Sequence, residues 1–338
     1  MPNRIKLALG VAVSLVCTIL IVRGLNWQES ARAVASVDPW LLLISAPVLA
    51  SGLVFKAVRW RALFHPRRDI STWRLFDAAN IGFLVNNLLP ARVGELVRPY
   101  VLSETGGPPY AWGLSTVVVE RTLDVVTVVV VALAVIAFLP VPYWLAAAAL
   151  GLGAAGLLLL GTMVFVAGRE QAIAALARRA LRLTPLPVDT WTDRIAAIVR
   201  GFAPLREPRA MGVVVLWTIP LWMAPFTALF LLTRGVGLDL PFYAAVFATC
   251  VIGLGVAAPS SPGQVGLFEG AGLVGLSVFT PDAARALAAV FLFHALNYII
   301  TCALGLVSLA RTGLTYRRVV AAVTAPPAAG RPDVEPVS

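Results

Sequence analysis

The feature that most constrains this sequence is a series of apolar runs long enough to cross a lipid bilayer. A transmembrane helix needs about 20 mostly apolar residues, because the hydrocarbon core is about 30 Å thick. Six segments approach or exceed this length: residues 5–22, 40–58, 114–139, 143–167, 211–233 and 285–310. The composition agrees, since 59% of the 338 residues are hydrophobic and only 13% are charged. The sequence therefore predicts an all-α polytopic membrane protein.

Two further apolar regions, residues 75–102 and 242–279, are interrupted near the middle by proline and glycine. Each arm is about 12–17 residues long, or about 18–25 Å as a helix. A helix of that length is short for a full crossing of the bilayer. We therefore predict two re-entrant hairpins of broken helices in addition to six transmembrane helices.

Basic residues indicate on which side of the membrane the loops lie. They gather in residues 56–74, in residues 168–210 and in the tail from residue 311. Cytoplasmic loops are enriched in Lys and Arg, and six spans with two hairpins place all three segments on one side. This topology predicts cytoplasmic termini and contacts with anionic lipids of the inner leaflet. It accounts for the net charge of +10 without a nucleic-acid partner.

The two ends of the chain carry separate signals. Arg4 and Lys6 precede the first apolar run, as in a signal peptide, but no small-residue cleavage site follows at once, and we predict a retained helix. The tail, residues 316–338, becomes rich in proline beyond residue 325. We predict disorder from about that point.

A short motif occurs twice, once in each interrupted region. Residues 90–94 read PARVG and residues 262–266 read PGQVG, and an acid follows each, Glu95 and Glu269. Three spans per half would insert the halves in opposite orientations, as in transporters with inverted repeats. The sequence therefore predicts a first repeat over residues 1–139 and a second over residues 140–315.

Helix-breaking residues mark the place in each repeat where we expect a cavity. Proline and glycine free backbone groups from helical hydrogen bonds, which the membrane tolerates only inside protein or beside a wet cavity. We therefore expect a cavity near six residues: Pro90, Gly94, Pro259, Pro262, Gly263 and Gly266.

Charged residues around the first break are costly within a membrane. An isolated charge near the bilayer centre costs roughly 2.5–3.5 kcal/mol on insertion scales, so these residues should pair. One interpretation is structural bracing by ion pairs. The other is an anion-binding site, because the guanidinium fork matches phosphate or carboxylate. The predicted binding residues are Asn86, Asn87, Arg92, Arg98 and Arg121, and the acids that orient them or exchange protons are Glu95, Glu120, Asp124 and Glu269.

Other polar residues share helical faces in the apolar segments. Asp77 and Asn80 lie on one face of the first interrupted region, and His294, Asn297 and Tyr298 share a face in the last span. His294 is either a hydrogen-bonded buried histidine or a proton carrier. The chain has two histidines, and its three cysteines lie in apolar runs. We therefore predict no metal site and no cofactor.

These motifs together resemble those of a known family. The pattern N-x-L-x-P-x-R-x-G-E-x-x-R, then E-R-x-x-D, then P-x-x-P-G-x-x-G-x-x-E is similar to that of the lysylphosphatidylglycerol synthase transmembrane-region family, the flippase-like membrane domain of the bacterial multiple peptide resistance factor. Gln264 departs from the pattern, where family members often carry glycine. The matching residues are Asn86, Leu88, Pro90, Arg92, Gly94, Glu95, Arg98, Glu120, Arg121, Asp124, Pro259, Pro262, Gly263, Gly266 and Glu269.

The resemblance implies lipid translocation across the bacterial cytoplasmic membrane. We expect a non-enzymatic flippase that moves an anionic or polyprenyl-phosphate-type lipid by alternating access, with the headgroup held between the two hairpins. The alternatives are an intramembrane transferase that acts on a lipid-phosphate donor, and a scaffold subunit of a membrane assembly. Beyond the lipid, the partners considered are a second copy of the chain and a protein of envelope biosynthesis.

Overall fold

The structure is a computed structural model, and it describes residues 27–67, 69–90, 92–137, 143–184, 187–256 and 261–324. Helices make up its regular structure, and these residues contain no strand. The predicted first helix at residues 5–22 and the predicted disorder beyond residue 325 lie outside the described residues.

Four of the described helices are long and apolar enough to cross a membrane. They are α3 (Pro39–Ala62), α7 (Tyr143–Val166), α10 (Pro208–Gly235) and α13 (Ala283–Thr312). Helix α6 (Tyr110–Ile136) has a similar length but carries three charged residues near its middle. These elements confirm the prediction of an all-α polytopic membrane protein.

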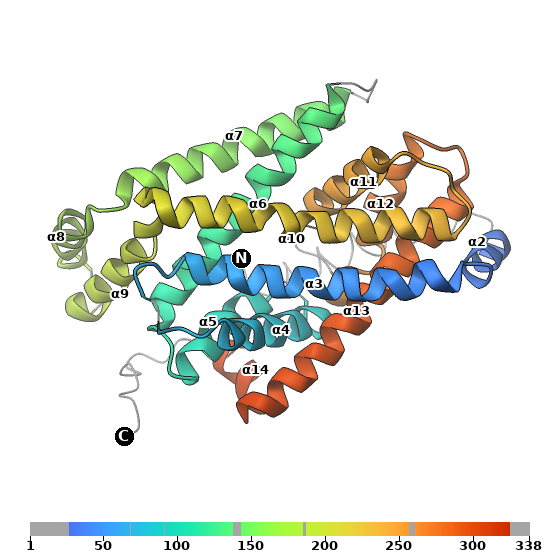
Figure 1. The fold of residues 1–338 in the computed structure, drawn as a ribbon. Coiled ribbons are helices and arrows are strands. Elements are labelled where there is room, and N and C mark those ends of the chain that lie inside the picture. Colours follow the sequence, from blue (N-terminus) through green and yellow to red (C-terminus); the bar gives the residue numbers. More distant parts are fainter. Residues whose placement is uncertain are drawn as a thin grey trace.

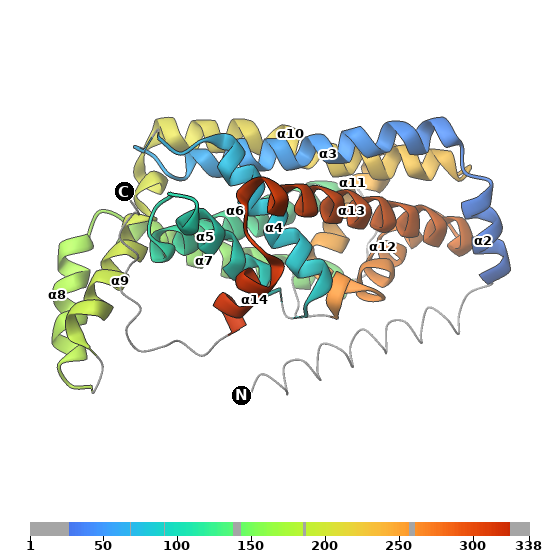
Figure 2. The ribbon, with the colours of Figure 1, turned by 90° about the horizontal axis from the view of Figure 1, so that it is seen from below.

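Helices α3 and α10 run side by side along most of their length (Figures 1 and 2). Gly52 permits this approach, because a Cβ there would lie 3.2 Å from the Cβ of Ala224. Helix α3 ends at Ala62, four residues beyond the predicted span. Lys56 and Arg59, which the sequence counted with the basic segment 56–74, therefore both lie inside the helix, and both are buried.

Each interrupted region forms two packed helices with a break between them. The first consists of α4 (Thr72–Leu88) and α5 (Gly94–Glu104). The second consists of α11 (Phe242–Gly255), a 3₁₀ turn η2 (Pro262–Gln264) and α12 (Leu267–Ser277). The breaks lie where the sequence predicts them. Their re-entrant insertion into the bilayer stays a prediction.

The remaining helices lie toward the ends of the long ones (Figures 1 and 2). Helix α2 (Trp27–Ala35) precedes α3, and α14 (Tyr316–Thr324) follows α13. The basic segment 168–210 is folded into α8 (Glu170–Leu181), α9 (Val188–Arg200) and the 3₁₀ turn η1 (Ala203–Arg206). Helices α8 and α9 pack against each other as a pair beyond the end of α7.

Two large groups of buried apolar side chains hold the helices together. One joins α10, α11, α12 and α13, and includes Leu229, Leu232 and Phe293. The other joins α3, α4, α5 and α6, and includes Trp60 and Ile81. The indole Nε1 of Trp60 donates to Thr116 Oγ1 at 3.0 Å, which fixes α3 against α6. The first break and the charged residues lie beside this second core.

Candidate functional site

A buried cluster of charged side chains lies where α3, α5 and α6 meet. We call it the arginine cluster. The three helices each contribute charges one turn apart, a spacing that puts them on one helical face. The side chains of Arg59, Arg98 and Glu120 are fully buried. The members in ion-pair contact are Lys56, Arg59, Glu95, Arg98, Glu120, Arg121 and Asp124.

Glu120 is the centre of the arginine cluster. Its Oε1 lies 2.5 Å from Lys56 Nζ and 2.8 Å from Arg121 Nη2. Arg98 binds it with both terminal nitrogens, at 2.7 and 3.1 Å. Arg59 Nη2 lies 3.9 Å from the same carboxylate. One carboxylate therefore contacts four cations, in the kind of network that lets buried charges persist in an apolar environment.

The other two carboxylates lie on either side of Glu120. Asp124 accepts from Arg59 Nη2 at 2.5 Å and lies 3.5 Å from Arg121. Glu95 lies 3.5 Å from Arg98 and 3.7 Å from Arg121. Their side chains keep 14% and 17% exposure, against 0% for Glu120. These two acids form the accessible edge of the cluster.

Close packing of the first hairpin holds Arg98 in place. Its guanidinium stacks on the ring of Trp60, 4.2 Å from the centroid. A Cβ at Gly82 would lie 2.4 Å from Arg98 Cγ, and a Cβ at Gly94 would lie 1.9 Å from the carbonyl oxygen of Gly82. Both glycines are therefore required for α4 and α5 to approach closely enough to bury this arginine.

Arg92 lies in the first break, next to this cluster. Its backbone is left-handed, with φ 55°. The only other non-glycine residue with positive φ in the described ranges is Gln264, at 62°, the equivalent position of the second motif. The Arg92 side chain interacts electrostatically with Arg121, Glu95 and Asp124. It makes no ion pair or hydrogen bond with any residue that the structure describes.

Donors outnumber acceptors in this region. With Arg92, five cations lie among three carboxylates in the described part of the chain. Four buried Nε–H groups have no hydrogen-bond partner there, those of Arg59, Arg92, Arg98 and Arg121. Buried polar groups are rarely left unpaired. The arrangement can therefore bind an anion that supplies the missing acceptors.

The second break has different chemistry. Glu269 Oε2 accepts from the Gly266 backbone N–H at 2.7 Å, and its Oε1 lies 2.6 Å from His294 Nδ1. The His294 ring stacks on Phe268 with centroids 4.2 Å apart. Among the described residues Glu269 contacts no member of the arginine cluster. The predicted acid is thus present at the break, but its partner is a histidine.

The remaining predicted residues lie around the two breaks. Asn86 Oδ1 accepts from Gly94 N at 2.7 Å, and Asn87 Nδ2 donates to Thr301 Oγ1 of α13 at 2.9 Å. A Cβ at Gly263 would lie 3.5 Å from the Asn87 carbonyl oxygen and 3.0 Å from the Tyr298 ring, so the two breaks adjoin. Pro262 begins η2, Pro90 precedes Arg92, and Pro259 lies outside the described residues.

Three other predicted residues form hydrogen bonds or ion pairs within a helix or between helices. Asp77 accepts from Ser308 Oγ at 2.9 Å and lies 3.6 Å from Arg311, which joins α4 to α13. Asn80 Nδ2 donates to the Phe76 carbonyl at 2.9 Å. The Asn297 carbonyl accepts from Thr301 Oγ1 at 2.6 Å. These residues lie outside the arginine cluster.

Sequence reasoning missed two members of the arginine cluster, Lys56 and Arg59. Both were counted with the basic segment 56–74, although Lys56 also lies within the predicted span 40–58. The available signal was their spacing of three, which continues the helical period beyond residue 58. Arg59 also reaches α10, where its Nη1 donates to Thr218 Oγ1 at 3.4 Å.

Comparison with known proteins gives a family and one curated relative. Residues 7–305 match the family described as Lysylphosphatidylglycerol synthase TM region. Glycosyltransferase AglD of Haloferax volcanii is 25% identical over 335 residues, which cover 88% of this chain and 53% of the relative. The chain thus spans about half the length of the curated relative it matches. No solved structure matches the chain.

These findings support a lipid-related membrane protein and correct one prediction. The sequence predicted a protein that is not an enzyme. That prediction is contradicted by the relative, which carries the name of a glycosyltransferase. The resemblance stated from the motifs is confirmed by the family match.

Proposed function

Because the chain belongs to the lysylphosphatidylglycerol synthase transmembrane-region family, we propose that its arginine cluster binds the anionic headgroup of a membrane lipid. Binding there serves the movement of the lipid between leaflets by alternating access of the two hairpins. A polyprenyl-phosphate-type lipid or an anionic phospholipid fits this class of substrate. The membrane is the cytoplasmic membrane of a bacterium, with both termini inside.

The excess of donors in the arginine cluster is the observation that carries this proposal. Five cations with three carboxylates leave a net charge of +2 on the described residues of this site, and Arg92 has no ion-pair partner among them. Phosphate carries negative charge and several acceptor oxygens, and arginine binds it with two parallel hydrogen bonds. A phosphate headgroup next to Arg92 and Arg121 would offset the excess positive charge and could accept from the unpaired Nε–H groups of these two arginines.

Glycosyl transfer is a second candidate function, favoured by the name of the relative from Haloferax volcanii. A transferase would hold the phosphate of a lipid-linked sugar donor with the same arginines. Its general base must reach the acceptor hydroxyl, and Glu95 and Asp124 are the carboxylates at the accessible edge. The two candidates therefore share a binding site and differ in whether a bond to the sugar breaks.

Arg92→Lys tests the proposed binding. Lysine keeps the positive charge but loses the planar fork, so the variant should fold normally and lose most lipid movement. The protein is reconstituted in vesicles that contain fluorescent phosphatidylglycerol, and transfer between leaflets is followed by quenching from outside. Arg182→Gln, an exposed arginine outside the arginine cluster, is the control.

The same vesicles separate the two candidates. Vesicles with a lipid-phosphate-linked sugar are assayed for sugar transfer to an added acceptor. Movement without transfer supports the lipid transporter, and transfer that is lost in Arg92→Lys supports the transferase. Wild-type rates of both processes in Arg92→Lys would refute a role for this site.

A further inference from the structure

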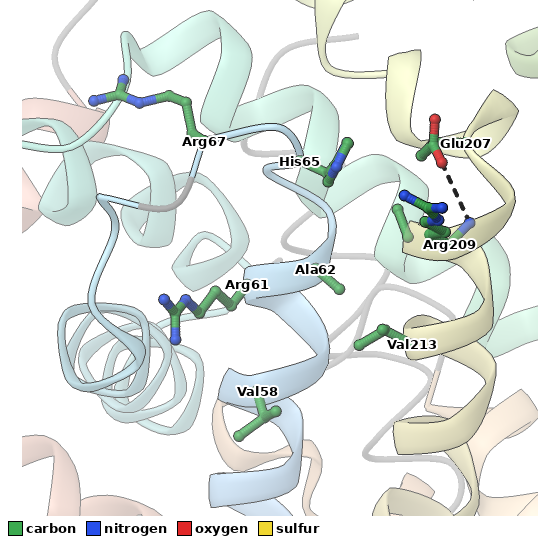
Figure 3. A pocket seen from close by; sticks show the side chains of 9 residues that line it. Val58, Arg61, Ala62, His65, Arg67, Glu207, Arg209 and Val213 are labelled. Carbon is green, nitrogen blue, oxygen red and sulfur yellow. Dashed lines mark hydrogen bonds between the residues drawn. The ribbon is translucent and has the colours of Figure 1, made fainter.

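A groove opens between the C-terminal end of α3 and the N-terminal end of α10 (Figure 3). Its volume is about 560 Å³, within the range of small-molecule sites. Val58 and Ala62 of α3 and Ala210 and Val213 of α10 form apolar walls. No member of the arginine cluster is among the residues that line this groove. The groove is therefore separate from the arginine cluster.

The mouth of the groove is polar and positively charged. It is lined by Arg61, His65, Arg67, Glu207 and Arg209. In Figure 3, Arg209 lies across the opening from His65, whereas Arg61 and Arg67 extend away from α10. Three arginines and one carboxylate line this mouth, so the local field favours an anion.

Arg209 is the cation best placed to bind a ligand here. Arg67 pairs with Asp69, and Arg61 Nη1 donates to Thr72 Oγ1 at 3.3 Å. Glu207 Oε1 accepts from the backbone N–H of Arg209 at 3.4 Å, where it caps α10. The Arg209 side chain itself is exposed and has no ion-pair partner in the described ranges.

The apolar walls continue into a surface that faces the membrane. Both helices are long and apolar enough to span a bilayer. Along them the large apolar side chains of Val54, Val213 and Leu216 are 37%, 41% and 62% exposed. Side chains of this kind on a spanning helix contact acyl chains. A ligand of this groove must therefore have both an anionic group, for the positively charged mouth, and an apolar part, for the apolar walls.

We propose that this groove binds one anionic phospholipid of the adjacent leaflet. Its phosphate lies between Arg209 and His65, and its chains lie over Val58 and Val213. Basic pockets between transmembrane helices recognise lipid headgroups in this way, and the arginine fork matches a phosphate diester. The site lies outside the arginine cluster, so its occupancy does not depend on lipid movement.

Native mass spectrometry of the full chain tests the site. Protein is released from vesicles of phosphatidylcholine or phosphatidylglycerol with the same acyl chains, and retained lipid is counted. Arg209→Gln should weaken retention of phosphatidylglycerol by about tenfold, because a hydrogen bond to a charged group is lost. Val213→Trp should lower retention of both lipids by filling the groove.

Two comparisons decide the outcome. Arg182→Gln removes the same charge next to α8, at the same end of the molecule (Figures 1 and 2), and should retain phosphatidylglycerol like the wild type. Equal losses in Arg182→Gln and Arg209→Gln, or equal wild-type retention of the two lipids, would overturn the proposal. Arg209→Lys, which keeps the charge, replaces Arg209→Gln if that variant does not fold, and intermediate retention is then expected.

Discussion

The two breaks share a backbone conformation but differ in the charges around them. Arg92 and Gln264 occupy the same position of the repeated motif and have φ of 55° and 62°. Around Arg92 lies the arginine cluster, with cations in excess. Near Gln264, Glu269 is held by one histidine and one backbone N–H. Anion binding is therefore expected at the first break alone.

The backbone conformation of a break is therefore independent of the ligand that the break can bind. A left-handed conformation costs a residue with a side chain roughly 1–2 kcal/mol. It persists only where surrounding contacts fix it. Its occurrence at both equivalent positions indicates that the motif specifies a path of the backbone. The side chain at that position is then free to differ between the halves.

The largest expected effect is at the glycines of the two breaks. Gly94→Ala places a Cβ 1.9 Å from the Gly82 carbonyl oxygen, and should cost about 3 kcal/mol or more through overpacking. Gly266→Ala instead forces alanine into a backbone conformation with positive φ, 84°, and should cost about 1–2 kcal/mol of stability. Thermal unfolding in detergent measures both.

Gly161→Ala is the control for these variants, since nothing lies within 4 Å of a Cβ at that helical position. It should melt at or slightly above the wild-type temperature. If Gly94→Ala also melts like the wild type, the close approach of α4 and α5 is wrong.

Neutralising one acid beside each break gives effects of comparable size. Glu120→Gln leaves four cations around an uncharged amide and should cost about 3–5 kcal/mol. In Glu269→Gln the amide oxygen can still accept from the Gly266 N–H, and only the negative charge that faces His294 is lost. This variant should therefore cost about 1–2 kcal/mol of stability. Equal losses of thermal stability would show that the two breaks do not differ in charge balance.

The sequence predicted most of the arginine cluster, because charge in an apolar segment is so costly that such residues must meet. Arg98, Glu120 and Arg121 were predicted on this ground, and the structure brings them into contact. Lys56 and Arg59 were not predicted. A charge at the end of an apolar run faces water or protein according to its distant neighbours, and their partners lie on α6, some 60 residues away in the chain.

The partner of Glu269 was equally beyond the sequence. Spacing placed it after a break, as it did Glu95, and the sequence left open whether it orients the arginines or exchanges protons. Which cation it meets depends on how α12 packs against α13, where His294 lies 2.6 Å away. Helix boundaries and breaks are local properties of the chain, whereas these pairings depend on tertiary packing.

The smallest expected effect concerns the left-handed residues themselves. Gln264→Gly should stabilise the protein by up to about 1 kcal/mol, because glycine adopts positive φ without strain. Arg92→Gly should stabilise it further in detergent alone, since it also removes a cation that has no partner among the described residues. Thermal unfolding without added lipid measures this difference.

Added phosphatidylglycerol then sharpens the comparison. A ligand that binds the folded state raises its stability by mass action. The wild type and Gln264→Gly should therefore gain stability with this lipid, and Arg92→Gly should gain less. An equal gain in all three would mean that the lipid does not bind next to Arg92.

The contact between Asn87 and α13 has a practical consequence. Asn87 Nδ2 lies 3.3 Å from the thiol of Cys302, which is partly exposed, whereas Cys250 is buried. The protein thus carries a native reporter group where the first hairpin meets the last long helix, beside the adjoining breaks. Its rate of modification by a small thiol reagent would register any separation of these elements, without an engineered label and during turnover.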